Sequence, residues 1–181
     1  MLIQNASQET YLGITNINFI LQKFIMLEKE TFKTVVKNAP LVSIDLCIVW
    51  DGKILLGKRK NDPLKGVFFT PGGRILKNEA HIDCLNRLAS SELGLIVGDI
   101  KQPELMGVWD HFYENSIFGE GVSTHYVNLP HCIHYNQRPE ILPDDQHDTL
   151  EWFDLKKVAN NNNFHKYMQS YASWIISRKP Q

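Results

Sequence analysis

The fold is decided by residues 72–95, which read GGRILKNEAHIDCLNRLASSELGL. Pro71 and the pair Gly72-Gly73 permit a sharp turn that leaves backbone groups open to a ligand. From Glu79 onward, apolar residues recur at spacings of three and four, which predicts a helix with one buried stripe. Gly94 stands where a left-handed C-terminal cap is expected. The buried stripe of this helix comprises Ile82, Leu85, Leu88, Ala89 and Leu93.

The charged side chains of this stretch suggest what the helix holds. Arg87 and Glu92 stand on a helix that follows a glycine turn, a layout suited to a diphosphate and its cation. Positions 88, 91 and 92 are expected to share one helical face, since residues three and four apart are neighbours. The alternative is an ordinary amphipathic helix behind a glycine turn.

These spacings resemble the Nudix box. That motif has Gly, five residues, Glu, seven residues, Arg-Glu, an aliphatic residue, any residue, Glu-Glu, any residue, Gly and an aliphatic residue. Leu88 and Ser91 stand where the motif has Glu, so only one helix carboxylate remains. One carboxylate predicts one Mg²⁺, which keeps several waters and takes ligands from substrate phosphates. The matching positions are Gly73, Glu79, Arg87, Glu92, Gly94 and Leu95.

Further motifs in the same order extend the resemblance over roughly residues 26–155. The chain is similar to the GDP-mannose mannosyl hydrolases, a branch of the Nudix family with the same two gaps in its box. The resemblance implies an α+β fold, the Nudix α/β/α sandwich with a mixed β-sheet, over residues 26–181. Residues 1–25 are an extension of uncertain role, either an accessory helix or the product of an upstream start codon. The further motifs occupy residues 40–45, 55–59, 107–109, 111–113, 124–127 and 145–148.

Outside the box, hydrophobic periodicity and breakers place the remaining elements. We expect the sheet to be built from several short strands, joined at one point by a hairpin at Asp51-Gly52. Polar loops are expected over 60–66, 114–121 and 136–148. The predicted helices cover 28–38 and 164–178, and the predicted strands cover 41–50, 53–59, 67–70, 104–113, 122–135 and 150–153.

Arg59 and Arg74 are the cations expected to bind a diphosphate. A guanidinium offers a planar fork that matches phosphate oxygens, and it stays charged. Arg59 ends a predicted strand and Arg74 follows the glycine turn, so both can reach the mouth of one pocket. A solvated surface charge is the alternative for each. The resemblance assigns both to the substrate diphosphate and the leaving group.

Asp45 lies in the middle of the alternating segment 41–50. A buried carboxylate is costly without partners. Two roles therefore fit: a structural carboxylate paired with a backbone group or an arginine, and a carboxylate of the ligand site. The resemblance implies the second role, as a catalytic-site residue in contact with the substrate.

His147 is the candidate catalytic base. It lies in a polar segment with neighbouring carboxylates, where a histidine can titrate near neutrality and take a proton from water. An isolated loop histidine is usually solvated, so the catalytic role depends on the resemblance. The resemblance also implies a salt bridge between Arg87 and Glu79.

The resemblance supplies the remaining ligand contacts. His111 and Tyr126 would touch the sugar or the diphosphate, although a core role fits Tyr126 nearly as well. Mg²⁺, which Mn²⁺ can replace, would be bound by the backbone carbonyl of Gly72, by Glu92 and by Gln146.

The implied reaction is hydrolysis of GDP-mannose, with GDP-glucose and GDP-fucose as further substrates. Water would attack the anomeric carbon with inversion and release GDP. Two other functions stay open. The first is a nucleotide-sugar diphosphatase that cleaves the P–O–P bridge, which the reduced carboxylate cluster disfavours. The second is a non-catalytic nucleotide-sugar binding module, which retention of Glu92, Gln146 and His147 disfavours.

The composition of the chain limits the classes of protein to which it can belong. The 181 residues suffice for one domain with a good core, and 43% hydrophobic and 22% charged residues are typical of soluble globular proteins. A net charge of -1 predicts no broad basic surface for nucleic acid. The chain contains no stretch of eighteen apolar residues, so the sequence predicts no membrane span. Three cysteines without a close pair suit buried thiols in a reducing cytoplasm, and the resemblance implies a homodimer.

Overall fold

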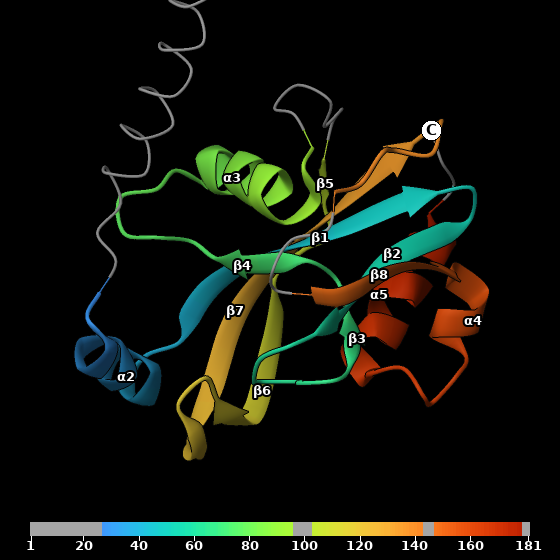
Figure 1. Ribbon diagram of the computed structural model, residues 1–181. Helices are drawn as coiled ribbons and strands as arrows, with labels where there is room; N and C mark the ends of the chain where they lie inside the picture. Colours follow the sequence, from blue (N-terminus) through green and yellow to red (C-terminus); the bar gives the residue numbers. More distant parts are fainter. Residues whose placement is uncertain (1–26, 96–102, 143–146, 179–181) are drawn as a thin grey trace, which may run out of the picture.

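A mixed β-sheet forms the centre of the fold. The computed structural model describes residues 27–95, 103–142 and 147–178, with the backbone alone for residues 147 and 148 (Figure 1). Strand β1 (Leu41–Trp50) runs parallel to β7 (Gly119–Tyr135) and antiparallel to β2 (Lys53–Arg59). The sheet order is β3-β2-β1-β7-β5, and β4, β6 and β8 pair with β1, β7 and β2. The other strands are β3 (Phe68–Phe69), β4 (Gly72–Arg74), β5 (Glu104–Leu105), β6 (Trp109–Ser116) and β8 (His147–Asp154).

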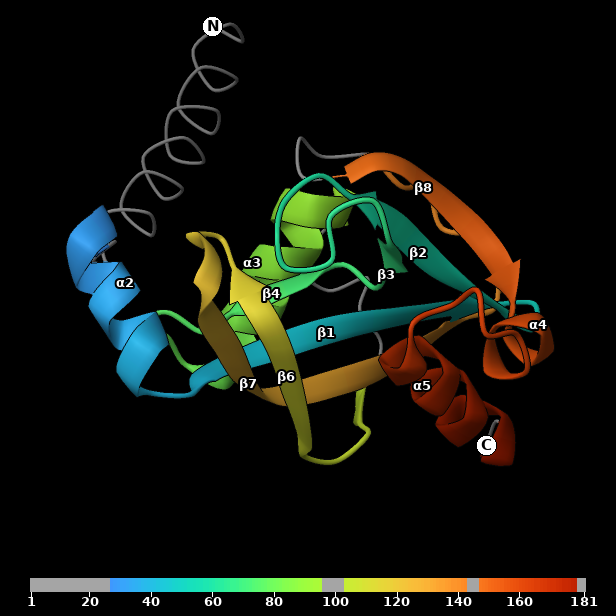
Figure 2. The ribbon, with the colours of Figure 1, turned by 90° about the horizontal axis from the view of Figure 1, so that it is seen from below.

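Helices cover both faces of the sheet (Figures 1 and 2). Helix α3 (His81–Leu93) lies on one face, and α4 (Leu155–Ala159) and α5 (Lys166–Ser177) lie on the other. Helix α2 (Lys29–Asn38) packs at one end, against β7. This arrangement is the predicted α/β/α sandwich with a mixed sheet. Among the helices within the described ranges, none is long and apolar enough to cross a membrane.

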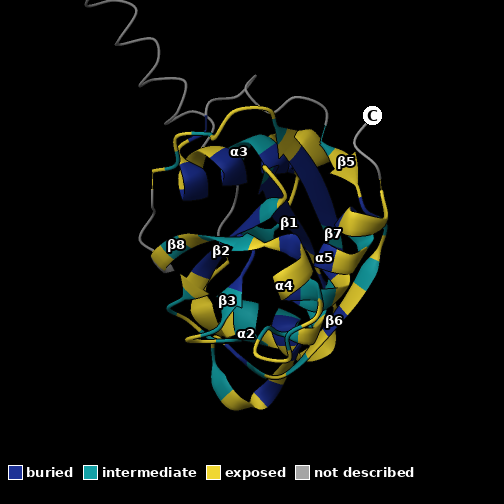
Figure 3. Ribbon diagram, turned by 90° about the vertical axis from the view of Figure 1, so that its right-hand side faces the viewer, coloured by how far each residue is buried: buried dark blue, intermediate teal, exposed yellow. Residues whose placement is uncertain are grey.

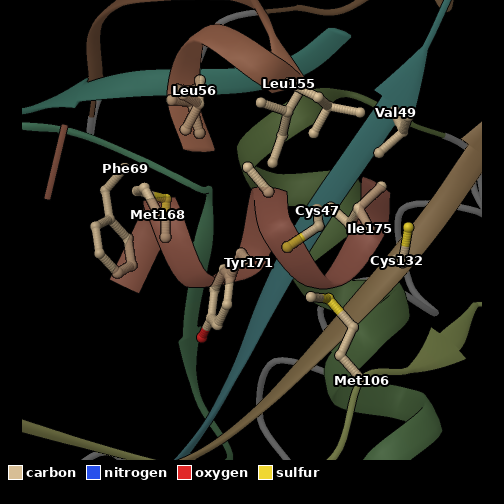
Figure 4. Packing of buried hydrophobic residues seen from close by; sticks show 13 residues of the cluster. Cys47, Val49, Leu56, Phe69, Met106, Cys132, Leu155, Met168, Tyr171 and Ile175 are labelled. Carbon is tan, nitrogen blue, oxygen red and sulfur yellow. The ribbon is translucent and has the colours of Figure 1, made fainter. Parts of the chain in front are cut away.

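Strand β1 contributes to both hydrophobic cores because successive side chains of a strand point to opposite faces. Ile44 and Leu46 pack in the core below α3, whereas Cys47 packs with residues of α5. Figure 4 shows this second core, in which the ring of Tyr171 lies among apolar side chains. The sequence predicted the alternation, and the helices on both faces explain why nearly the whole strand is buried (Figure 3).

The box helix differs from its prediction at its first turn. It begins at His81 rather than Glu79, and Ala80 caps it in an extended conformation. Glu79 stays outside the helix because its carboxylate accepts hydrogen bonds from the Leu76 amide and from Arg87. Ile82 is 55% exposed, so its assignment to the buried stripe is wrong, and Cys84 is buried instead. Gly94 adopts the predicted left-handed cap, with a φ of 66°.

The second half of the chain contains four further corrections. The predicted strand 104–113 is split into β5 and β6, separated by a segment in which Gly107 has a φ of 113°. The predicted loop 114–121 is instead a short hairpin turn, because β6 and β7 stay paired up to Ser116 and Gly119. Strand β8 starts at residue 147 rather than 150, and the short helix α4 was not predicted.

Candidate functional site

One pocket gathers most of the predicted site residues. It has a volume of about 250 Å³ and lies beside β1, β4, β6 and β7. Six of the nine predicted site residues line it, although they come from five different strands. The six are Asp45, Arg59, Gly72, Arg74, His111 and Tyr126.

Of the three other predicted residues, Glu92 and the backbone of His147 lie next to residues that line this pocket. Glu92 is attached to its glycine wall through Gly72. His147 is the first residue of β8, and its Cα pairs with that of the pocket residue Arg59. It therefore begins a strand rather than lying in the predicted loop. Its side chain and Gln146 lie outside the described residues.

The two glycines form an extended strand, not the predicted sharp turn. In β4, Gly72 pairs with Asp45 of β1, and Gly73 pairs with Ile44. A Cβ added to Gly72 would lie 2.6 Å from Asp45 Oδ1 and would also overlap the carbonyl oxygen of Ile44. Glycine is required here because two backbones approach closely.

The carboxylate of Glu92 faces this glycine strand from α3. Its Oε2 accepts a hydrogen bond of 2.9 Å from the Gly72 amide, and the residue is only 2% exposed. Leu88 faces the same strand, because its Cδ2 would lie 2.8 Å from a Cβ on Gly73. Ser91 is exposed. The side of α3 that faces β4 therefore carries one carboxylate and one leucine.

The predicted salt bridge between Arg87 and Glu79 is confirmed. Arg87 Nε lies 2.6 Å from Glu79 Oε1, and its Nη2 lies 2.9 Å from Oε2. Arg87 Nη2 also donates to the carbonyl oxygen of Arg74 at 3.1 Å. Burial alone would raise the pKa of Glu79, but the bonds from Arg87 and the Leu76 amide hold this pKa below its ordinary value. The pair ties the loop after β4 to α3.

Two arginines supply positive charge to the pocket. Arg59 Nε donates to the carbonyl oxygen of Pro63 at 2.9 Å, and the register of β2 with β8 shifts between Gly57 and Arg59. Such bulges re-aim side chains near active sites. The guanidinium of Arg74 lies 4.0 Å from the ring centre of Phe32 in α2. Burial lowers the pKa of Arg74, but a guanidinium remains charged in proteins.

Asp45 takes part in a buried polar network that the sequence did not predict. Its Oδ2 accepts hydrogen bonds from Asn128 Nδ2 at 2.6 Å and from the Tyr171 hydroxyl at 3.0 Å. Burial raises the pKa of Asp45 to about 6, while Asn128, Tyr171 and Arg59 act to lower it. The polar residue Asn128, between apolar neighbours on a predicted strand, was the signal that could have indicated this partner.

His111 belongs to the same network. It is 1% exposed and stacks on Tyr167, with ring centres 3.7 Å apart. Its Nε2 lies 3.1 Å from the Tyr171 hydroxyl, and its Nδ1 lies 3.2 Å from Asn128 Nδ2. Burial lowers the pKa of His111 to about 4, so its ring is neutral at physiological pH.

The donor atoms near β4 fit a hard divalent cation bound mostly by its substrate. In an extended strand the N–H and C=O of one residue point to the same side. The Gly72 carbonyl therefore lies on the side of Glu92, whose Oε2 already accepts the Gly72 amide. One carboxylate oxygen and one carbonyl suit Mg²⁺, which completes its shell with phosphates and water. Within the described ranges, no group of three or more His, Cys, Asp or Glu could hold a metal ion.

Comparison with known proteins gives the family. The NUDIX domain model matches residues 40–174. The low-salt glycan biosynthesis protein Agl8 of Haloferax volcanii is 35% identical over 143 residues, which are 78% of this chain and 86% of that protein. The ADP-ribose pyrophosphatase of Methanocaldococcus jannaschii is 43% identical over 136 residues, which are 75% of each chain.

Solved structures agree with this assignment. A MutT NUDIX hydrolase from Burkholderia pseudomallei has a TM-score of 0.61 and 27% identity, covering 76% of this chain and 99% of that chain. The NUDIX domain of Shewanella oneidensis NrtR, complexed with ADP ribose, has a TM-score of 0.60 and covers 84% and 93% of the two chains. Its identity of 16% shows the fold alone. Because the family model spans the whole sheet and the salt bridge of the box is present, the chain belongs to the Nudix hydrolase family.

Proposed function

We propose that the protein hydrolyses GDP-mannose to GDP and mannose by attack of water on the anomeric carbon, with inversion. GDP-glucose and GDP-fucose are proposed as further substrates. The observation that carries this proposal is the side of α3 that faces β4, where Glu92 is accompanied by the buried Leu88 rather than by a second carboxylate. A helix with one carboxylate at this face lacks the second carboxylate that would activate water for attack on phosphorus. We therefore assign the general base to a residue outside α3.

The diphosphate is assigned to the cationic part of the pocket. Arg59 and Arg74 both line it, and guanidinium groups bind phosphate oxygens through paired hydrogen bonds. A bound Mg²⁺ or Mn²⁺, held by Glu92, the Gly72 carbonyl and Gln146, would supply further charge to stabilise the departing GDP. A leaving group neutralised in this way requires no general acid.

The base is assigned to His147. Pairing of β8 with β2 brings the backbone of His147 opposite Arg59, which lines the pocket. In the proposed step the histidine takes a proton from water, and the water oxygen bonds to the anomeric carbon. The bond from that carbon to the phosphate oxygen breaks, and its electron pair leaves with GDP. The transition state is oxocarbenium-like, as in other glycoside hydrolysis.

The sugar is assigned to the part of the pocket near Asp45 and Tyr126. Both ring nitrogens of His111 contact protein groups, so this residue would meet the substrate only through its ring edge. The Tyr126 ring lies in the pocket wall, near Tyr113. We also propose a homodimer, which light scattering of the purified protein would test.

A second function has one observation in its favour. The relative named ADP-ribose pyrophosphatase is 43% identical to this chain. In a diphosphatase reaction, water would attack phosphorus and yield GMP and mannose 1-phosphate from GDP-mannose. A third possibility, a nucleotide-sugar binding module, would bind GDP-mannose without turnover.

Product analysis in heavy-oxygen water separates the three. The protein is incubated with GDP-mannose and Mg²⁺, and the products are analysed by mass spectrometry. Label in free mannose, together with unlabelled GDP, supports attack at carbon. Label in GMP or mannose phosphate identifies the diphosphatase. Absence of turnover with Mg²⁺ and with Mn²⁺, combined with measurable binding, identifies the binding module.

A further inference from the structure

A closed ring of four hydrogen-bonded side chains lies at the wall of the pocket, and three of its members line the pocket. Its members come from four elements: Asp45 from β1, His111 from β6, Asn128 from β7 and Tyr171 from α5. All four are buried. Tyr171 belongs to the core between the sheet and α5 (Figure 4), and its hydroxyl donates a hydrogen bond to Asp45.

The donors in this ring can be assigned from chemistry alone. An amide nitrogen has hydrogens and no acceptor site, so Asn128 Nδ2 donates both to Asp45 Oδ2 and to His111 Nδ1. His111 Nδ1 must then carry a lone pair, and the neutral ring carries its hydrogen on Nε2. That hydrogen points at the Tyr171 oxygen, and the Tyr171 hydroxyl donates to Asp45 Oδ2.

The orientation of Asn128 supports this assignment. Its Oδ1 is buried and has no hydrogen-bond partner within the described part of the chain. Rotating the amide would place this oxygen against the carboxylate oxygen of Asp45, and two acceptors would then face each other. The observed orientation leaves one neutral oxygen without a partner and satisfies the carboxylate.

The two oxygens of Asp45 consequently have different surroundings. Oδ2 receives two protein donors. Oδ1 lies against Gly72, where a Cβ would come within 2.6 Å, and no described residue donates to it. Gly72 and Asp45 both line the pocket. Two bonds to one oxygen determine the plane of a carboxylate, and they leave the other oxygen to accept from a ligand.

We propose that Asn128 and Tyr171 are positioning residues, which hold Asp45 through Oδ2 so that Oδ1 faces the substrate, and which keep His111 in its Nε2–H tautomer. The ligand group at Oδ1 would be a hydrogen-bond donor, such as a sugar hydroxyl. This inference rests on the proposed function only for the identity of the substrate. The core packing of Tyr171 makes the arrangement rigid before any ligand binds, which is the requirement for a preorganised site.

The tautomer is tested first, by NMR of the ring nitrogens of His111 in the unliganded protein. We expect a protonated Nε2 and an unprotonated Nδ1 at neutral pH. In Asn128→Leu, which removes the amide that donates to Nδ1, the fixed tautomer should become a mixture. In Tyr135→Phe, at the end of β7 and outside the pocket, it should not change. A protonated Nδ1 in the native protein, or an unchanged spectrum in Asn128→Leu, overturns the proposal.

A double-mutant cycle tests whether Tyr171 acts through Asp45. Tyr171→Phe should lower kcat/KM on the order of 10- to 100-fold in the native background. In an Asp45→Asn background the same substitution should change kcat/KM by less than about twofold, because the group that it positions is already gone. An equal loss in both backgrounds means that Tyr171 only supports the fold, and the proposal is then wrong.

Two further comparisons keep the outcomes separate. Asn128→Leu removes the other donor to Oδ2, and it should reproduce the kinetic loss if Tyr171→Phe unfolds the protein. If GDP-mannose is not hydrolysed but the tautomer result holds, the proposed function fails and the positioning role stands. The double-mutant cycle is then measured on the affinity of the protein for GDP-mannose instead of on kcat/KM.

Discussion

The amide of Gly72 donates a hydrogen bond of 2.9 Å to Glu92 Oε2, which joins the glycine strand β4 to the box helix α3. One carboxylate thereby orients the strand that forms a pocket wall. Gly72 also touches Asp45 on its other side. Gly72 therefore contacts two of the predicted site residues, Glu92 and Asp45.

Glu92→Gln separates the hydrogen bond to Gly72 from the proposed role of Glu92 as a Mg²⁺ ligand. The amide oxygen can still accept from Gly72, so the fold should persist, but the negative charge for Mg²⁺ is lost. We expect kcat/KM to fall about 100-fold and the Mg²⁺ concentration for half activity to rise. Activity is measured over a Mg²⁺ titration. Glu104→Gln, which alters a surface pair with Arg178, should leave the titration curve unchanged; an identical curve for Glu92→Gln would remove Glu92 as a ligand.

Gly72→Ala and Gly73→Ala form a matched pair. The Cβ at 72 meets backbone and the Asp45 carboxylate, whereas the Cβ at 73 meets the end of the flexible Leu88 side chain at 2.8 Å. We expect Gly72→Ala to lower the free energy of unfolding by about 1–3 kcal/mol, and Gly73→Ala by less. Urea unfolding of both variants gives the comparison. Equal destabilisation would contradict the close approach of β4 to β1.

His147→Gln tests the base. The amide cannot take a proton from water but retains a polar side chain of similar size. We expect turnover to fall by roughly two to four orders of magnitude while the affinity for GDP-mannose stays similar. Single-turnover kinetics and calorimetry measure the two quantities. His125→Gln changes a histidine paired with Asp110 on the surface of β7 and serves as the control. Near-normal turnover in His147→Gln would assign the base to another group.

The Glu79–Arg87 pair predicts a pH dependence of stability. The folded pKa of Glu79 lies below its ordinary value of 4.5, so the pair contributes fully above about pH 4.5. This contribution is lost as the pH falls through the folded pKa. In Glu79→Gln, the decline in the free energy of unfolding between about pH 5 and about pH 3 should be smaller than in the native protein. Urea titrations across this range measure it, and parallel pH curves would contradict the assignment.

Arg87→Met leaves the carboxylate of Glu79 buried without its partner. Because the Glu79 side chain is fully buried, removing the arginine should cost about 3 kcal/mol at neutral pH. The double variant Glu79→Gln/Arg87→Met should recover part of this loss, since the uncompensated charge is gone. Recovery below the error of the unfolding measurement would show that the arginine acts by packing alone.

The sequence by itself determined the family, the box helix and most of the strands. These depend on local signals: the spacing of Gly73, Glu79, Arg87 and Glu92, the apolar period of α3, and the alternation of β1. The glycine cap at residue 94 and the pair Glu79–Arg87 follow from the same motif. Local patterns suffice for such features because the spacing of apolar residues follows the period of a helix or strand that buries one face.

Tertiary structure alone decided how the site is assembled. The partners of Asp45 are 83 and 126 positions away in the sequence, at Asn128 and Tyr171, and no local spacing connects them. The same holds for Arg59 and His147, which meet only because β8 pairs with β2. Gly72 was predicted as a turn residue, although a neighbouring backbone is what requires it. A buried carboxylate takes its donors from whatever elements pack around it, and that packing is a property of the whole sheet and its two helical layers.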